Sequence, residues 1–156
     1  MFVGSGFDIH KHSKNEQLVL GGVKIDGEGF EAHSDGDIIL HSLCDALLGS
    51  KAKRDLGYYF PSNESTPKNI SSVEMLNKVM EIIEIDKLVI NNVDITVLSQ
   101  IINISQVSEE IRSNLGKLLR IDMNTINVKG KSFDYLGVIG DGTASACFAL
   151  ISVKDA

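Results

Sequence analysis

The sequence is poor in cysteine, proline and tryptophan. Its 156 residues include two cysteines, two prolines and no tryptophan. Cys44 and Cys147 belong to no CxxC pair, which argues against a disulfide framework or a zinc ribbon and fits a reducing compartment. We therefore expect Cys44 to be a small buried thiol without a chemical role.

Long apolar runs and an excess of positive charge are also missing. No run approaches the roughly 20 residues of a membrane span, and the start MFVGSGFDIHKH lacks the regions of a signal peptide. The formal charge of -6 offers no basic field to a polyphosphate backbone. We expect a cytoplasmic protein, or an organellar one if a targeting segment has been removed, without membrane or nucleic-acid partners.

The remaining composition is that of a globular chain, with 43% hydrophobic and 23% charged residues. Residues 1–156 are predicted to form a single domain, because the chain is long enough to bury its own core. The pattern predicts an α+β fold, a mixed β-sheet with helices packed on one face. The expected strands are 2–10, 18–25, 88–100, 126–133 and 144–154, and the expected helices are 34–50, 72–85 and 105–121.

All four histidines lie within the first 41 residues. Asp8 and His10 are two apart on a predicted strand and share a face, while Asp37, His41 and Asp45 form one stripe of a predicted helix. If strand and helix pack together, Asp8, His10 and His41 form a three-ligand site with an open fourth position, as in catalytic zinc centres. Asp45 would then accept the second ring N–H of His41. Ordinary surface or core histidines remain the alternative.

The other two histidines lead to different expectations. His12 falls in a polar loop, 11–17, and is predicted to be solvated. His33 precedes Ser34 and Asp35 at a predicted helix start, where free backbone N–H groups favour an anion such as a phosphate. Simple N-capping by the serine or the aspartate is the alternative. A long loop, 53–71, follows the helix, and such loops are often functional.

A third polar region is VKGKSFDYLGVIGDGTASA, residues 128–146. Lys129, Lys131, Ser132 and Asp134 offer cations, a hydroxyl and a carboxylate within six residues. This combination suits a phosphate held together with Mg2+, which prefers one or two carboxylates plus phosphate oxygens. No GxxxxGK[ST] motif is present, so a P-loop is excluded.

Taken in order, the stretches GFDIH, LGGVKI, AHSDGDIILHSLCDALLG, DLGYYFP, NNVDITVLSQ, INVKGKS and LGVIGDG resemble the 2-C-methyl-D-erythritol 2,4-cyclodiphosphate synthase family along the whole chain. The histidine-containing helix motif is the most specific of them. The resemblance implies a homotrimer with active sites between subunits. It also implies conversion of 4-diphosphocytidyl-2-C-methyl-D-erythritol 2-phosphate to the cyclic diphosphate with release of CMP, in non-mevalonate isoprenoid biosynthesis.

The resemblance also implies roles for individual residues, with His33 and Ser132 as the expected catalytic residues. It assigns zinc to Asp8, His10 and His41, substrate phosphate to His33 and Ser34, the methylerythritol portion to Asp55, Gly57 and Phe60, and the cytidine diphosphate with Mg2+ to Lys131, Ser132 and Asp134.

The chain departs from the family pattern at several positions. Ser62 replaces a carboxylate that contacts diol hydroxyls, Asp134 replaces a glutamate, and Lys131 replaces a threonine. We expect catalysis to be retained, with two alternatives: a zinc-dependent phosphoesterase or a non-catalytic trimeric cytidine-nucleotide binder. Further departures affect the expected nucleotide loop, at Ile101, Ile102 and Asn103, and the expected central cavity of the trimer, at Asp141 and Thr143.

Overall fold

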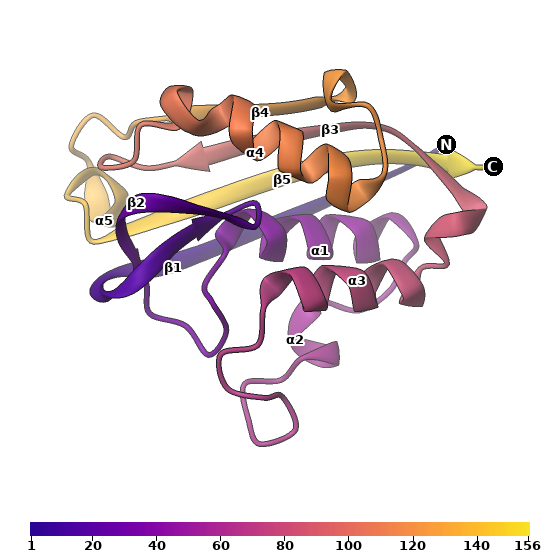
Figure 1. The fold of residues 1–156 in the computed structure, drawn as a ribbon, viewed down its shortest axis with the longest axis horizontal. Coiled ribbons are helices and arrows are strands. Elements are labelled where there is room, and N and C mark those ends of the chain that lie inside the picture. Colours follow the sequence, from indigo (N-terminus) through magenta and orange to yellow (C-terminus); the bar gives the residue numbers. More distant parts are fainter.

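A computed structural model describes residues 1–156 and contains one five-stranded sheet with the strand order β2-β1-β5-β3-β4 (Figure 1). β3 and β4 are parallel, and all other neighbouring strands are antiparallel, so the predicted mixed sheet is confirmed. The strands are β1 (Phe2–Leu20), β2 (Val23–Phe30), β3 (Leu88–Leu98), β4 (Ile126–Lys131) and β5 (Ala144–Asp155).

The helices cover one face of this sheet. In Figure 1, α1 and α3 lie below the strands and α4 crosses in front of β3 and β4. Along β5, Cys147 and Ala149 are buried towards the helices, whereas Phe148 and Leu150 alternate with them and are exposed. The predicted one-sided packing is therefore confirmed. The helices are α1 (Ile38–Ser50), α2 (Leu56–Tyr59), α3 (Ser72–Ile82), α4 (Ile104–Leu119) and α5 (Gly137–Gly140), with short 3-10 turns at Ile85–Lys87 and Met123–Thr125.

The prediction of two separate strands at the start of the chain was wrong. β1 continues through the polar segment and changes its partner from β5 to β2 near His12, with a bulge between Ser13 and Leu18. His12, which was expected to be solvated, is buried because it lies where the two pairings meet. The predicted strand 18–25 is a hairpin instead, since Gly21 and Gly22 both have positive φ and form its turn.

Asp37 determines where α1 begins. The predicted start at Ser34 was too early, because Asp37 is the N-cap and accepts hydrogen bonds from the backbone N–H groups of Ile39 and Leu40. The same carboxylate accepts from Gly21 at 2.9 Å and Gly22 at 2.7 Å. Burial raises the pKa of Asp37 to about 6, and the N–H donors oppose that shift. The side chain therefore ties the β1–β2 turn to the helix as a carboxylate at neutral pH.

Both cysteines are free and buried, as expected for Cys44. Burial raises the pKa of the Cys44 thiol well above its usual range, which keeps it protonated and unreactive. No helix combines the length and the apolar character needed to cross a membrane.

The first prediction concerns Asp37→Asn. An amide would turn an NH2 group towards backbone N–H groups, leaving buried donors without acceptors, so we expect a loss of about 1–3 kcal/mol in the free energy of unfolding. Thermal and urea unfolding measure this loss. Asp26→Asn, on the exposed edge of β2, is the control and should be neutral. Equal stability of the two variants would contradict the role of Asp37.

Candidate metal centre

The candidate site forms where β1 passes unusually close to α1. Gly4 and Gly6 face the helix, and a Cβ atom on either would lie 1.8 Å from a backbone oxygen of Ala46 or Ser42. Only glycine permits this approach. Because Asp8 and His10 follow on the same face of the strand, the approach carries both side chains to His41 on the helix.

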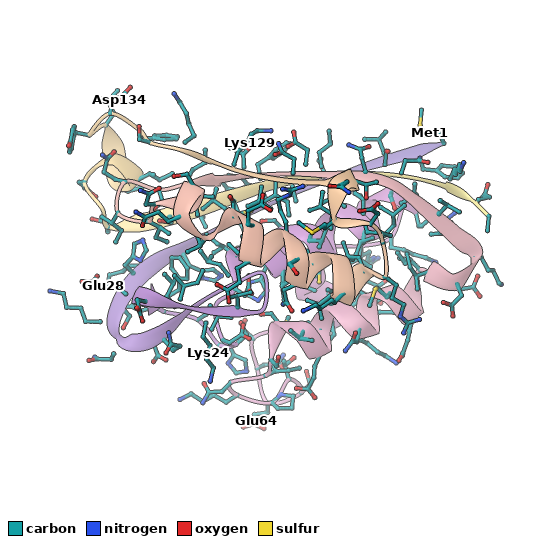
Figure 2. All side chains as sticks on the ribbon, turned by 45° about the horizontal axis from the view of Figure 1, so that its top comes forward. Met1, Lys24, Glu28, Glu64, Lys129 and Asp134 are labelled. Carbon is teal, nitrogen blue, oxygen red and sulfur yellow. The ribbon has the colours of Figure 1, made fainter.

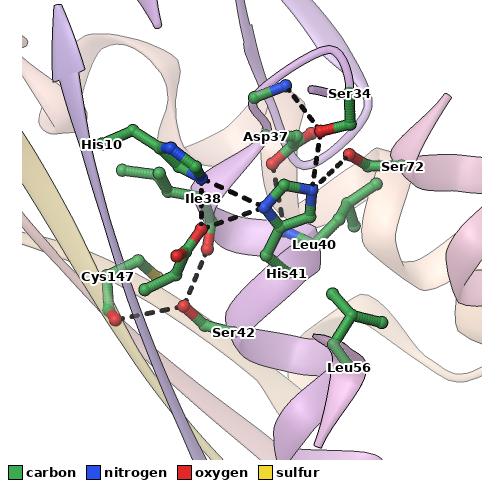
Figure 3. Close-up of polar contacts among 12 residues, drawn as sticks. His10, Ser34, Asp37, Ile38, Leu40, His41, Ser42, Leu56, Ser72 and Cys147 are labelled. Atoms are coloured by element: carbon green, nitrogen blue, oxygen red, sulfur yellow. Dashed lines mark hydrogen bonds and ion pairs between the residues drawn. The ribbon is translucent and has the colours of Figure 1, made fainter. Parts of the chain in front are cut away.

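Three potential ligand atoms converge there (Figure 3). Asp8 Oδ2 lies 2.9 Å from His10 Nε2 and 2.9 Å from His41 Nδ1, and the two ring nitrogens are 3.3 Å apart. A tetrahedral zinc ion with bonds of about 2.0–2.2 Å holds its ligand atoms about 3.3 Å apart, so these residues fit such an ion with little adjustment. Asp8, His10 and His41 are thus a group that could hold a metal ion, as the spacing predicted.

The electrostatics of the cluster are set by the carboxylate. Burial raises the pKa of Asp8, but hydrogen bonds and charge interactions with His10 and His41 outweigh it and hold the pKa well below its usual range. Burial lowers the pKa of His41, yet the hydrogen bond and charge of Asp8 outweigh this effect and raise it. A metal ion must therefore displace a proton that Asp8 stabilises on His41, which makes metal binding weaker at acidic pH.

The second ring nitrogen of His41 contacts two hydroxyl groups, not the predicted carboxylate. His41 Nε2 lies 3.0 Å from Ser72 Oγ and 3.1 Å from Ser34 Oγ. Ser72 in turn donates to Asp35 Oδ1. Since the Ser72 hydroxyl hydrogen is committed to Asp35, its oxygen accepts the Nε2–H of His41, and this leaves Nδ1 free to bind a metal ion.

The predicted role of Asp45 was wrong. Its Oδ1 accepts a hydrogen bond of 2.7 Å from the backbone N–H of Leu56 and so holds the start of α2. The i, i+4 spacing put Asp45 on the same side of the helix as His41 but could not show that α3 packs against α1 and brings Ser72 to the ring. No sequence signal distinguished Ser72 from an ordinary residue at the start of a helix.

Most of the predicted substrate residues line one cavity of about 240 Å³ around the three ligands. His33 is held there by a 2.9 Å contact between its Nε2 and the carbonyl oxygen of Thr66. Asp55, at the N-cap position of α2, makes no capping hydrogen bond and is not part of the lining. The predicted residues that line the cavity are Asp8, His10, His33, Ser34, His41, Asp45, Gly57, Phe60 and Ser62.

Lys131, Ser132 and Asp134 lie elsewhere. Lys131 and Ser132 line a separate cavity of about 390 Å³, formed with residues 99–105. Asp134 is exposed beyond the end of β4, at the opposite end of the sheet from Met1 (Figure 2). One chain therefore does not bring the two halves of the predicted site together.

The fold and the site together define an α+β protein with an aspartate and two histidines converging between a strand and a helix, beside hydroxyl groups suited to an anion. The chain belongs to the YgbB family, whose model matches residues 1–154. It is 36% identical over 155 residues to the 2-C-methyl-D-erythritol 2,4-cyclodiphosphate synthase of Desulforamulus reducens, and the alignment covers 99% of each chain.

Solved structures are similar over almost the whole chain. IspF of Plasmodium falciparum in its CDP complex superposes with a TM-score of 0.86 and is 39% identical, covering 99% of this chain and 96% of that one. The bifunctional IspDF from Campylobacter jejuni superposes with a TM-score of 0.93 at 34% identity. The superposed region covers 99% of this chain but only 42% of the bifunctional protein.

The second prediction tests the hydroxyl behind His41. Ser72→Ala removes the acceptor that orients the His41 ring, so we expect the zinc dissociation constant to rise about 10–100-fold. A competition titration against a chromophoric chelator measures the zinc dissociation constant. Ser71→Ala is the matched control, because Ser71 caps α3 through the Val73 N–H and does not contact His41. Unchanged zinc affinity in Ser72→Ala would contradict the assignment.

Proposed function

We propose that this chain converts 4-diphosphocytidyl-2-C-methyl-D-erythritol 2-phosphate to 2-C-methyl-D-erythritol 2,4-cyclodiphosphate and CMP, in non-mevalonate isoprenoid biosynthesis. The observation that carries the proposal is the convergence of Asp8, His10 and His41 in a cavity that also contains His33 and Ser34. Membership of the YgbB family and the name of the Desulforamulus reducens relative support it.

The reaction requires positioning more than side-chain acids or nucleophiles. An oxygen of the substrate's own 2-phosphate forms a bond to the β-phosphorus, the bond from that phosphorus to the bridging oxygen breaks, and CMP leaves with that oxygen. Holding the two ends of one substrate together can supply up to roughly 7–11 kcal/mol. Zinc at the Asp/His/His site, when bound, supplies neutralisation of phosphate charge and polarisation of phosphorus.

The side chains around the ligands bind and orient the phosphates. Ser34 Oγ already accepts the Gly36 N–H at 3.1 Å and touches His41, so its hydroxyl hydrogen is available to a phosphate oxygen. His33 Nε2–H donates to a phosphate oxygen when that oxygen replaces the carbonyl oxygen of Thr66 as its acceptor. Gly57, Phe60 and Ser62, which line the same cavity, hold the methylerythritol portion, with Asp55 next to them at the start of α2.

The second cavity is assigned to the cytidine diphosphate. Lys131 contributes a cation and Ser132 a hydroxyl hydrogen to the phosphates. The Ser132 hydroxyl also lies 3.4 Å from Asp134 Oδ1, so that carboxylate is close enough to hold Mg2+ against the same phosphates. The CDP bound in the related Plasmodium falciparum structure supports a nucleotide ligand of this kind.

A homotrimer would unite the two cavities, with the metal ligands of one subunit facing Ser132 of the next. Two observations support it: the predicted residues divide between separate cavities, and large apolar side chains are exposed along β1 and β5. Phe7 and Phe148 are paired neighbours on that face and are 54% and 42% exposed. We also propose a cytoplasmic location, which the two free thiols support.

The decisive experiment follows the substrate by 31P NMR in the presence of Zn2+ and Mg2+. Cyclic diphosphate formed in equal amount to CMP is the expected result. Hydrolysed, uncyclised product would instead indicate a zinc-dependent phosphoesterase, and cytidine-nucleotide binding without turnover would indicate a non-catalytic binder. His41→Ala, which lacks one metal ligand, should retain no zinc and form no product.

The third prediction concerns Asp134→Asn. The variant keeps the shape of the side chain but loses the negative charge that Mg2+ requires, so its Mg2+ activation curve should shift to higher concentration by about tenfold or more. Zinc content, measured by elemental analysis, should stay at the wild-type value because Asp134 lies outside the Asp/His/His cavity. If wild-type protein and Asp134→Asn had the same Mg2+ activation curve, Asp134 would not be a magnesium ligand.

The fourth prediction concerns the assembly. Native mass spectrometry should give a mass of three chains, and Phe148→Asp should shift the population to single chains because a carboxylate cannot be buried unpaired in an apolar interface. Lys24→Asp, exposed on β2, serves as the charge-changing control and should remain trimeric. A trimer that persists in Phe148→Asp would show that this face is not the contact.

A further inference from the structure

Three buried polar side chains from different parts of the chain form a connected row that the proposed chemistry does not use. His12 lies on β1, Ser145 on β5, and Ser99 directly after β3. His12 Nε2 is 2.8 Å from Ser145 Oγ, and Ser145 Oγ is 2.7 Å from Ser99 Oγ. All three side chains are buried. Such a row is expensive to bury unless every polar atom is paired, so its members constrain one another.

The histidine end of the row is fixed from two sides. Its ring packs on Phe30 with centroids 4.7 Å apart, and Nδ1 lies 3.3 Å from the carbonyl oxygen of Glu28. The Ser145 hydroxyl donates to Ser99 Oγ, so the Ser145 oxygen accepts from the Nε2–H of His12. Ser145 is therefore the link of the row, accepting from His12 and donating to Ser99.

The other end of the row shapes a loop. Ser99 Oγ accepts from the backbone N–H groups of Ile101 at 3.3 Å and Ile102 at 3.1 Å. The backbone N–H of Ser99 donates to the carbonyl oxygen of Lys131 at 3.0 Å, which ties the loop to the end of β4. Residues 99–103 form one wall of the 390 Å³ cavity that also contains Ser132.

We propose that His12 and Ser145 are positioning residues that act through Ser99 to fix the backbone of residues 99–103 for the base and ribose of a cytidine nucleotide. This inference rests on the assignment of that cavity to the nucleotide. Neither His12 nor Ser145 lines the metal cavity, so the row sets nucleotide affinity and leaves the metal centre unchanged. The loop has no charged side chain, so its groups for a neutral base are the backbone N–H and C=O groups and the amides of Gln100 and Asn103, all of which depend on the backbone shape.

The test compares Ser145→Ala and His12→Phe with wild-type protein loaded with Zn2+ and Mg2+. Ser145→Ala removes both links of the row and His12→Phe removes one, so in each variant the dissociation constant of CMP should rise about tenfold, the effect of losing about 1.4 kcal/mol. The dissociation constant of inorganic pyrophosphate, which has no base, should not change. In turnover, KM should rise and kcat should be retained. Backbone amide exchange at Ile101 and Ile102 should become faster.

Two controls separate positioning from general destabilisation. Ser50→Ala removes another buried serine, whose hydroxyl donates to Leu47 O at the far end of α1, and should leave CMP affinity unchanged. His12→Gln keeps a polar side-chain end towards Ser145 and should recover part of the affinity lost in His12→Phe.

Wild-type CMP affinity together with unchanged exchange at Ile101 and Ile102 in both row variants would overturn the inference. Failure of the proposed function is distinguishable, because it would be seen in the wild-type protein as absence of CMP binding or of cyclic product. The exchange comparison needs no nucleotide and would still decide whether the row holds the loop.

Discussion

The close contact between β1 and α1 is the constraint on which the metal centre depends. Gly4 and Gly6 bring the strand against the helix backbone, and the ligand atoms of the next two inward-facing residues then lie within 2.9–3.3 Å of one another and of the His41 ring. A side chain at either glycine would separate the two elements by more than a metal–ligand bond can span. The close packing of β1 on α1 and the geometry of the metal ligands therefore depend on the same two glycines.

The cluster is preorganised by its hydrogen bonds. Asp8 accepts from both imidazoles, and the Ser72–Asp35 pair fixes the other side of the His41 ring. Asp37 anchors the helix start to the β1–β2 turn, so the helix that carries His41 cannot rotate independently of the strand that carries Asp8 and His10. These contacts reduce the reorganisation needed when a metal ion binds.

The polar chemistry of the chain is divided between two cavities and linked by buried hydroxyls. The metal cavity has carboxylate and imidazole ligands for a cation, while the second cavity has Lys131 and Ser132 for anions. The row from His12 to Ser99 starts on the strand that carries Asp8 and His10 and ends in the wall of the second cavity. The substrate proposed for this chain, with a diphosphate between two dissimilar ends, matches this division.

The sequence by itself determined the mixed sheet with helices on one face, the shared face of Asp8 and His10, and the family, because these depend on local periodicity and motif spacing. Tertiary structure decided the rest. Strand pairing buried His12 although its neighbours are polar, and α3 packing placed Ser72 at His41 in the role expected of Asp45. Both outcomes depend on contacts between segments distant in the chain, which local pattern does not encode.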